Sequence, residues 1–148
     1  MKTFTHCANM VEAVGMFLFD TDIITNVLKK KPSTRLLKHL ADVANNEQFI
    51  STITISEIVY GAAKSDRPEF HLHNLKTILL PSINVVGFDS KAAYICGRLR
   101  AELEKKGTHL DLADLEIAAI CIAGNFTLIT GNTKHFARIS ALRYANWL

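Results

Sequence analysis

Short hydrophobic runs rich in β-branched residues alternate with longer amphipathic stretches along the chain. Four runs have the length and composition of strands, namely 17–19, 49–54, 83–88 and 127–130. The spacing of apolar residues between them predicts helices over 21–30, 33–45, 55–64, 68–80, 89–106 and 112–124. Alternating strands and helices are typical of a parallel sheet that helices cover on both faces. The pattern therefore predicts an α/β fold, in which ligands bind beyond the carboxyl ends of the strands.

The composition is that of one globular domain. The chain has 148 residues, of which 49% are hydrophobic and 21% charged, with only seven Gly and three Pro. Such a chain can bury a substantial core, which excludes the disordered and collagen-like classes. No uninterrupted apolar run approaches the roughly 18–20 residues that span a bilayer, so we expect no membrane segment.

The three cysteines, Cys7, Cys96 and Cys121, are widely spaced and form no CxxC pair. This pattern disfavours a disulfide framework or a zinc site and favours a reducing cytoplasm. We expect Cys121, which lies in an apolar stretch, to be a core residue. Polar residues interrupt segment 1–15, which therefore does not match a signal peptide, and we interpret it as an N-terminal extension of a domain at 16–148.

The net charge is 17 − 14 = +3, and its distribution is more informative than its size. One stretch without an acid holds Lys29, Lys30, Lys31, Arg35 and Lys38, and the only charged side chains after Glu116 are Lys134, Arg138 and Arg143. Clusters of this kind contact phosphate groups, but solvated helix faces have the same composition. The sequence leaves both interpretations open.

Three acidic residues stand where predicted strands end or helices begin. Asp20 directly follows the first strand, Glu57 lies in the first turns of a helix, and Asp114 lies in the first turn of another. Each position has a purely structural alternative, because Asp20 or Thr21 can cap the next helix and an acid in a first turn is favoured by the helix dipole. Taken singly, none of these residues indicates a function.

Two more polar positions extend the group. Asn132 follows the last predicted strand, in a Gly-Asn sequence that also favours a plain turn. Asp111 can share a helix face with Asp114 or cap that helix, whereas Glu116 points away. Clustered carboxylates repel one another unless a cation neutralises them, and oxygen ligands of this kind bind Mg²⁺ or Mn²⁺. We therefore expect a site for a hard divalent cation.

Five motifs in this order resemble the PIN-domain ribonucleases, and most closely the VapC toxins of bacterial toxin–antitoxin pairs. They are FLFDTD at 17–22, ITISEIVYGA at 53–62, DLEIAA at 114–119, LITGNTKHFARI at 128–139 and YANW at 144–147. The resemblance runs from Met16 to Leu148. It implies a three-layer α/β/α sandwich with a mainly parallel sheet.

The resemblance also implies roles for individual residues. Asp20, Glu57 and Asp114 would be the acidic metal-binding residues, and Asn132 would take the fourth site position. Thr21 and Thr130 would be polar supports beside them.

Three positions depart from the family pattern. Asp22 stands where Asn is common and adds a carboxylate near the site, and Asp111 stands where relatives often have Gly. Asn132 stands where some relatives have Asp, which leaves a direct metal bond there open.

The implied reaction is metal-assisted hydrolysis of RNA phosphodiesters, transfer RNA among the substrates, with one or two Mg²⁺ or Mn²⁺ ions. It needs no side-chain nucleophile, and we expect none of the scattered histidines to be catalytic. The RNA backbone would be contacted by the basic side chains of Lys29, Lys30, Lys31, Lys134 and Arg138. The resemblance further implies a homodimer that a small antitoxin protein inhibits.

Two other functions compete with this interpretation. A PIN fold without catalysis would serve as an RNA- or protein-binding module. The Asp20-Thr-Asp22 sequence also resembles the first motif of haloacid-dehalogenase-type phosphatases, but no acid follows Glu116 to complete the metal site of that family.

Overall fold

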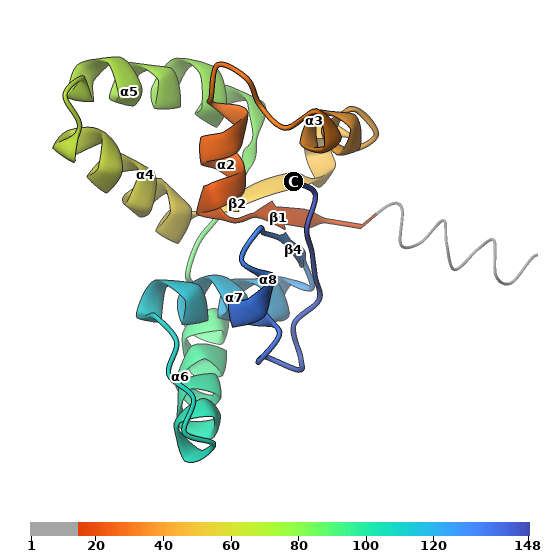
Figure 1. The fold of residues 1–148 in the computed structure, drawn as a ribbon. Coiled ribbons are helices and arrows are strands. Elements are labelled where there is room, and N and C mark those ends of the chain that lie inside the picture. Colours follow the sequence, from red (N-terminus) through yellow and green to blue (C-terminus); the bar gives the residue numbers. More distant parts are fainter. Residues whose placement is uncertain (1–14) are drawn as a thin grey trace, which may run out of the picture.

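The computed structural model describes residues 15–148 as a parallel sheet between two layers of helices (Figure 1). The predicted extension at 1–15 therefore lies outside the described residues except for Gly15, and so does Cys7. The sheet strands are β1 (Phe17–Phe19), β2 (Gln48–Ser51), β3 (Asn84–Val86), β4 (Thr127–Ile129) and β5 (Tyr144–Ala145). Their order is β3-β2-β1-β4-β5 and every neighbouring pair is parallel, which confirms the predicted three-layer α/β/α class.

The strand order places a change of direction between β1 and β4. The chain moves from β1 through β2 to β3 on one side, and then returns to add β4 and β5 on the other side of β1. Phe17 pairs with Gln48 of β2 and with Thr127 of β4, so β1 is the central strand. In open α/β sheets, ligands bind at such a switch point, beyond the carboxyl ends of the strands.

The helices divide between the two faces of the sheet (Figure 1). One face carries α2 (Thr21–Val27), α3 (Thr34–Ala41), α4 (Thr52–Lys64) and α5 (Pro68–Asn74), and the other carries α6 (Ser90–Lys105), α7 (Leu112–Gly124) and α8 (Thr133–Phe136). Shorter helical segments are a 3₁₀ turn at Asn45–Glu47, a π-helical turn at Leu75–Leu79 and a 3₁₀ turn at Leu80–Ser82.

The core forms two clusters, one on each face of the sheet. Leu18 is fully buried against residues of α6 and α7, whereas its neighbour Phe19 is buried on the opposite face, against α2 and α3. This alternation follows from the two-residue period of a strand. Ala118 and Ala119 are fully buried, because small side chains let α7 approach the sheet closely. Cys121 is a free and fully buried core residue, as predicted.

Several predicted boundaries are wrong. Thr52–Thr54 belong to α4 and not to the preceding strand, because the side chain of Ser51 accepts a hydrogen bond from Thr54 N at 3.0 Å and starts the helix there. The predicted helix 68–80 is α5 followed by the π-helical turn. The short elements α8 and β5 were not predicted. Within the described residues, no helix is long and apolar enough to cross a membrane.

Candidate active site

Asp20 lies at the switch point between β1 and β4. Its main-chain N–H donates to Ile129 O at 2.9 Å, which extends the parallel pairing one residue beyond β1. Its carboxylate is 6% exposed and accepts two hydrogen bonds, from Thr21 N and from Thr130 Oγ1, both at 2.8 Å. Asp20 therefore caps α2 through Oδ1, which was the structural alternative for this residue. Its Oδ2 accepts the hydrogen bond from Thr130 and so links the ends of β1 and β4.

Thr130 organises the loop that follows β4. Its main-chain N–H donates to Ala145 O, and its hydroxyl donates to Asp20 while accepting from Asn132 N at 3.0 Å. Asn132 is half-buried at the start of α8, and its side chain makes no capping hydrogen bond. The backbone of Asn132 is thus tied to Asp20 through the hydroxyl group of Thr130.

Thr21 connects Asp20 with Glu57. Its N–H donates to Asp20, and its hydroxyl donates to Glu57 Oε1 at 2.7 Å and lies 3.3 Å from Thr54 Oγ1. Glu57 is exposed on α4, three residues farther from the start of the helix than predicted, because α4 begins at Thr52. Thr21 thus joins the carboxylates of Asp20 and Glu57, and its role as a support of the site stays a prediction.

Asp114 reaches the same region from α7. Its side chain is only 18% exposed, and its Oδ2 lies 3.6 Å from His135 Nδ1 of α8. Burial raises the pKa of Asp114, the imidazole of His135 opposes this rise, and the charges of Asp111 and Glu57 add to it. Asp111 itself is the N-cap residue of α7 but makes no side-chain capping hydrogen bond. The proximity of His135 was not predicted, because its contact with Asp114 depends on how α8 packs against α7.

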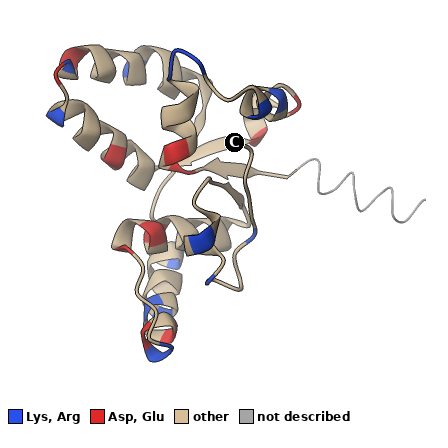
Figure 2. Ribbon diagram, viewed as in Figure 1, with Lys and Arg blue, Asp and Glu red and all other residues tan. Residues whose placement is uncertain are grey.

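The acidic side chains affect one another electrostatically. Burial raises the pKa of Asp20 from 3.8 to about 6, with the charges of Asp22 and Asp114 adding to the rise and the hydrogen bonds from Thr130 and Thr21 opposing it. Burial also raises the pKa of Asp22. Figure 2 shows acidic segments at the start of α2, on α4 and at the start of α7, and the charge of Asp114 acts on Asp20 while that of Glu57 acts on Asp114. The carboxylates of three motifs that are distant in sequence thus lie close together.

Asp22 anchors the loop after β4. Its Oδ2 accepts a hydrogen bond from Gly131 N at 2.9 Å, whereas its Oδ1 is buried with no hydrogen-bond partner. A Cβ atom at position 131 would meet Asp22 Oδ2 at 2.7 Å and Leu148 Cδ1 at 2.8 Å, so these two side-chain ends would have to move to admit it. Asp22, which departs from the family pattern, therefore positions the loop that carries Thr130 and Asn132.

The residues present fit a hydrated divalent cation. Among residues 15–148, no three His, Cys, Asp or Glu side chains are arranged as a ready-made ligand set. Mg²⁺, however, keeps several waters and is usually held by one or two carboxylates together with substrate phosphate. The raised pKa values and the unpartnered Asp22 Oδ1 are the signs of negative charge that lacks compensation. The metal-binding roles of individual residues stay a prediction.

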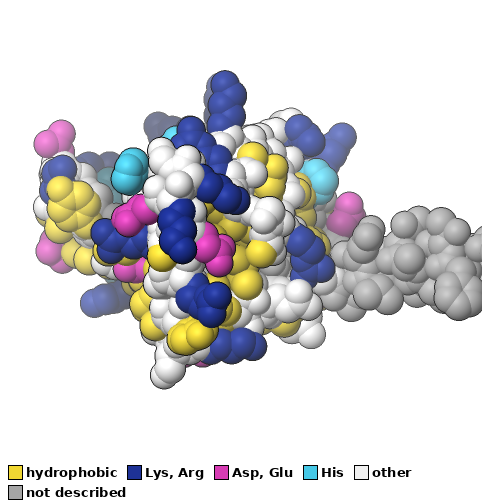
Figure 3. Space-filling model, turned by 90° about the horizontal axis from the view of Figure 1, so that it is seen from below, with side chains coloured by type: hydrophobic (Ala, Val, Ile, Leu, Met, Phe, Trp, Pro, Cys, Tyr) yellow, Lys and Arg dark blue, Asp and Glu magenta, His cyan; other side chains and the backbone are white. Residues whose placement is uncertain are grey.

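The basic side chains predicted to contact RNA lie in two separate parts of the chain, after α2 and on or just after α8. Lys29, Lys30, Lys31, Lys134 and Arg138 are all exposed. Arg35 is partly engaged, because its Nη1 donates to Leu148 O at 3.1 Å. On the face shown in Figure 3, basic side chains are interspersed with acidic ones.

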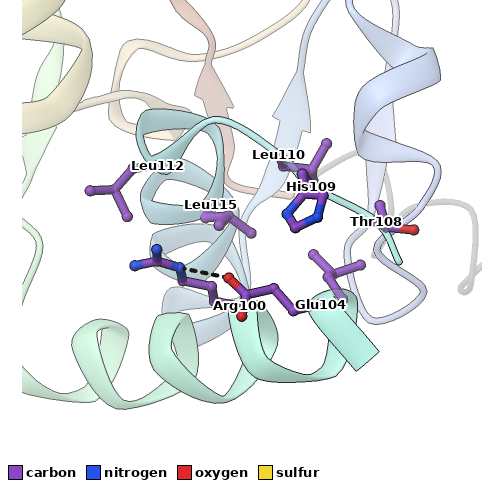
Figure 4. A pocket seen from close by; sticks show the side chains of 8 residues that line it. Arg100, Glu104, Thr108, His109, Leu110, Leu112 and Leu115 are labelled. Carbon is purple, nitrogen blue, oxygen red and sulfur yellow. Dashed lines mark hydrogen bonds and ion pairs between the residues drawn. The ribbon is translucent and has the colours of Figure 1, made fainter. Parts of the chain in front are cut away.

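A separate hollow of about 110 Å³ lies between α6 and the loop before α7 (Figure 4). Leucine side chains form much of its wall, among them Leu103, Leu112 and Leu115. The only acid in its lining, Glu104, pairs with Arg100 at 3.3 Å. This hollow therefore adds no free carboxylate to the acidic cluster.

Comparison with known proteins agrees with the fold and the motifs. Residues 17–142 match the model of the PIN domain family. The chain is 36% identical to "Ribonuclease VapC2" of Rickettsia felis over 132 residues, which cover 89% of this chain and 98% of that protein. It is 31% identical to "tRNA(fMet)-specific endonuclease VapC" of Shigella flexneri, with 88% and 97% covered.

Solved structures give the same result. The DNA-bound VapBC structure from Salmonella typhimurium matches with a TM-score of 0.83 at 30% identity, covering 90% of this chain and 99% of that chain. The DNA-bound VapBC2 structure from Rickettsia felis matches with a TM-score of 0.79 at 33% identity, with the same coverage. The shared fold, the full-length coverage and the positions of the motifs together show that this chain belongs to the PIN domain family, in its VapC-type ribonuclease branch.

Proposed function

We propose that this chain is a divalent-metal-dependent endoribonuclease that hydrolyses RNA phosphodiester bonds. The observation that supports this most directly is the convergence of Asp20, Glu57 and Asp114 at the switch point of the sheet, where three separate motifs bring their carboxylates to one edge. The relatives named as ribonucleases and endonucleases support the reaction class. Family membership also removes the support for a phosphatase of the haloacid-dehalogenase type.

The chain's own residues supply binding and orientation. Asp20 is buried and the side chain of Asp114 is 18% exposed, and these two carboxylates would hold Mg²⁺ or Mn²⁺, with Glu57 and the neutral amide of Asn132 beside them. A bound ion would lower the pKa of a water molecule and offset charge on the scissile phosphate. Thr21 and Thr130 keep the carboxylates of Glu57 and Asp20 in fixed orientations through their hydroxyl groups.

The exposed lysines and arginine would hold the RNA backbone. Lys29, Lys30 and Lys31 lie on the segment after α2, and Lys134 and Arg138 lie on or just after α8, next to the loop that carries Asn132. Contacts to phosphate are independent of sequence and weaken as salt concentration rises. We therefore expect RNA binding by this chain to fall steeply with ionic strength.

We also propose a small antitoxin protein and a second copy of the chain as partners. The similar solved structures from Rickettsia felis and Salmonella typhimurium are described as VapBC, which supports the antitoxin. A cationic side chain from such a partner would be stabilised in the acidic cluster, where it would replace the charge of the metal.

The direct test is cleavage of a mixed transfer-RNA pool by the purified chain without an antitoxin. The reaction is run with Mg²⁺, with Mn²⁺ and with chelator, for the wild type and for Asp20→Asn. Asp66→Asn is the matched control, because Asp66 is an exposed aspartate in the loop between α4 and α5. Discrete cuts that need metal and disappear only in Asp20→Asn would support the proposal.

The alternative of a non-catalytic binding module predicts a different result. A pure binder would retain RNA equally well in chelator and would leave the pool intact under every metal. If a folded wild-type protein gives that result, the nuclease proposal is wrong for these substrates.

A further inference from the structure

An exposed strip on α4 leads away from the acidic cluster. Glu57, Tyr60, Gly61 and Lys64 are all exposed, and their spacing of three, four and seven residues from Glu57 puts them on one face of the helix. Tyr60 is 64% exposed, although aromatic rings are usually among the more buried side chains. A Cβ atom on Gly61 would meet nothing within 4 Å, so the helix surface beside the ring is open.

Lys64 is paired with the ring of Tyr60. Its Nζ lies 4.7 Å from the ring centroid and donates a hydrogen bond to Tyr60 Oη at 3.1 Å. The strip therefore offers an aromatic ring and a fixed positive charge within two turns of Glu57. Proteins that bind single-stranded nucleic acids combine these two groups, because an aromatic ring stacks on a base while a cation contacts the phosphate.

We propose that Tyr60, together with Lys64, is a base-stacking subsite for an unpaired nucleotide next to the scissile phosphate. This inference rests on the proposed ribonuclease function and specifies its substrate as RNA that is single-stranded at the cut. Residues three or four apart on a helix have Cβ atoms about 5–6 Å apart, so a base on Tyr60 adjoins a phosphate held near Glu57. Bases in a duplex are stacked on their neighbours and cannot use the ring.

The test measures binding in chelator, so that it does not depend on cleavage. The probe is a short single-stranded RNA of mixed sequence labelled with fluorescein, and the readout is fluorescence anisotropy. We expect Tyr60→Ala to weaken binding about 5- to 150-fold, which is the range for loss of one base–aromatic stack. Tyr60→Phe keeps the ring and should bind within a factor of about two of the wild type. A duplex of the same sequence should bind the wild type and Tyr60→Ala equally.

Tyr94 of α6 provides a matched control. It is 67% exposed, and Arg98, four residues later, has its guanidinium carbon 6.0 Å from the ring centroid. Tyr94→Ala removes the same chemical group from a helix that carries none of the clustered acids, and we expect it to leave RNA binding unchanged. Thermal melting should show all these variants folded, since both tyrosines are exposed.

Three results would overturn the inference. Unchanged binding by Tyr60→Ala shows that no base stacks there, and an equal loss in Tyr60→Phe assigns the effect to the hydroxyl group. A change in sedimentation of Tyr60→Ala, with binding per folded dimer unchanged, shows that the ring serves contacts between copies instead. Failure of the nuclease proposal is distinguished separately, because it appears as absence of metal-dependent cleavage by the wild type.

Discussion

The buried charge of Asp20 should destabilise the metal-free protein at neutral pH. The pKa of Asp20 rises from 3.8 to about 6 in the folded protein, mainly through burial. A difference of one in pKa corresponds to about 1.4 kcal/mol, so ionising Asp20 costs about 3 kcal/mol more in the folded protein than in the unfolded chain. The folded state binds more protons between these two pKa values. The contribution of Asp20 to the stability of the folded protein is therefore highest below pH 3.8 and is lost as pH rises through about 6.

We therefore expect Asp20→Asn to be more stable than the wild type above pH 7 in chelator, by up to about 3 kcal/mol. The amide keeps an acceptor for Thr21 N and offers a donor to the hydroxyl of Thr130, which can accept. Below pH 4 the two proteins should unfold at similar urea concentrations. The exposed Asp66→Asn variant serves as the control and should show no pH-dependent difference.

Added metal should narrow the difference in stability between the wild type and Asp20→Asn. A ligand that binds only the folded wild type stabilises it by about 1.4 kcal/mol at ten times its Kd, and the variant should gain much less. The assay is urea unfolding at pH 4 and pH 8, with chelator and with Mn²⁺. A variant that is no more stable than the wild type at pH 8 in chelator would refute the reasoning, because burial would then impose no cost on the Asp20 carboxylate.

Substitutions at three further positions test the packing of the fold by urea unfolding. Asp22→Ala leaves the N–H of Gly131 without its acceptor and should cost about 1–3 kcal/mol, whereas Asp22→Asn keeps an acceptor and should cost less; equal losses would contradict the anchoring role. Gly131→Ala forces a methyl group toward Asp22 and Leu148 and should cost about 1–3 kcal/mol, with cleavage reduced as the loop moves. Trp147 is 8% exposed and its ring stacks on His39 at 4.7 Å, so Trp147→Ala should cost about 3–5 kcal/mol and Trp147→Phe distinctly less.

The family motifs allowed much of the candidate site to be named from the sequence. Asp20 follows the short apolar run Phe17–Phe19, Asn132 follows the β-branched run at 127–130, and strand ends in a parallel sheet share one edge. Asp114 lies in the first turn of a predicted helix, and its motif ends in Ala118 and Ala119, which are fully buried against the sheet. The boundary at Ser51 was missed because Thr52, Ile53 and Thr54 favour a strand by composition, while a side-chain cap starts the helix.

Other features depended on contacts between distant segments. The sequence suggested that Asp22 adds a carboxylate near the site, and the fold also brings it to Gly131, 109 positions away, where it accepts a main-chain hydrogen bond. His135 lay outside any expected ligand pair and is placed beside Asp114 by the packing of α8. Neither contact has a local signal, because both join residues that only the sheet order brings together.

The sequence alone determined the α/β class, the parallel sheet and the identity of the acidic residues, because hydrophobic periodicity and short motifs are local properties of the chain. Only the tertiary structure decided how those acids interact: the burial that raises the pKa of Asp20, the threonine hydroxyls that orient it and Glu57, and the loop held by Asp22. Burial and charge coupling depend on the distances between segments far apart in sequence. They are therefore set by the order β3-β2-β1-β4-β5, which joins β1 to β4 at the site.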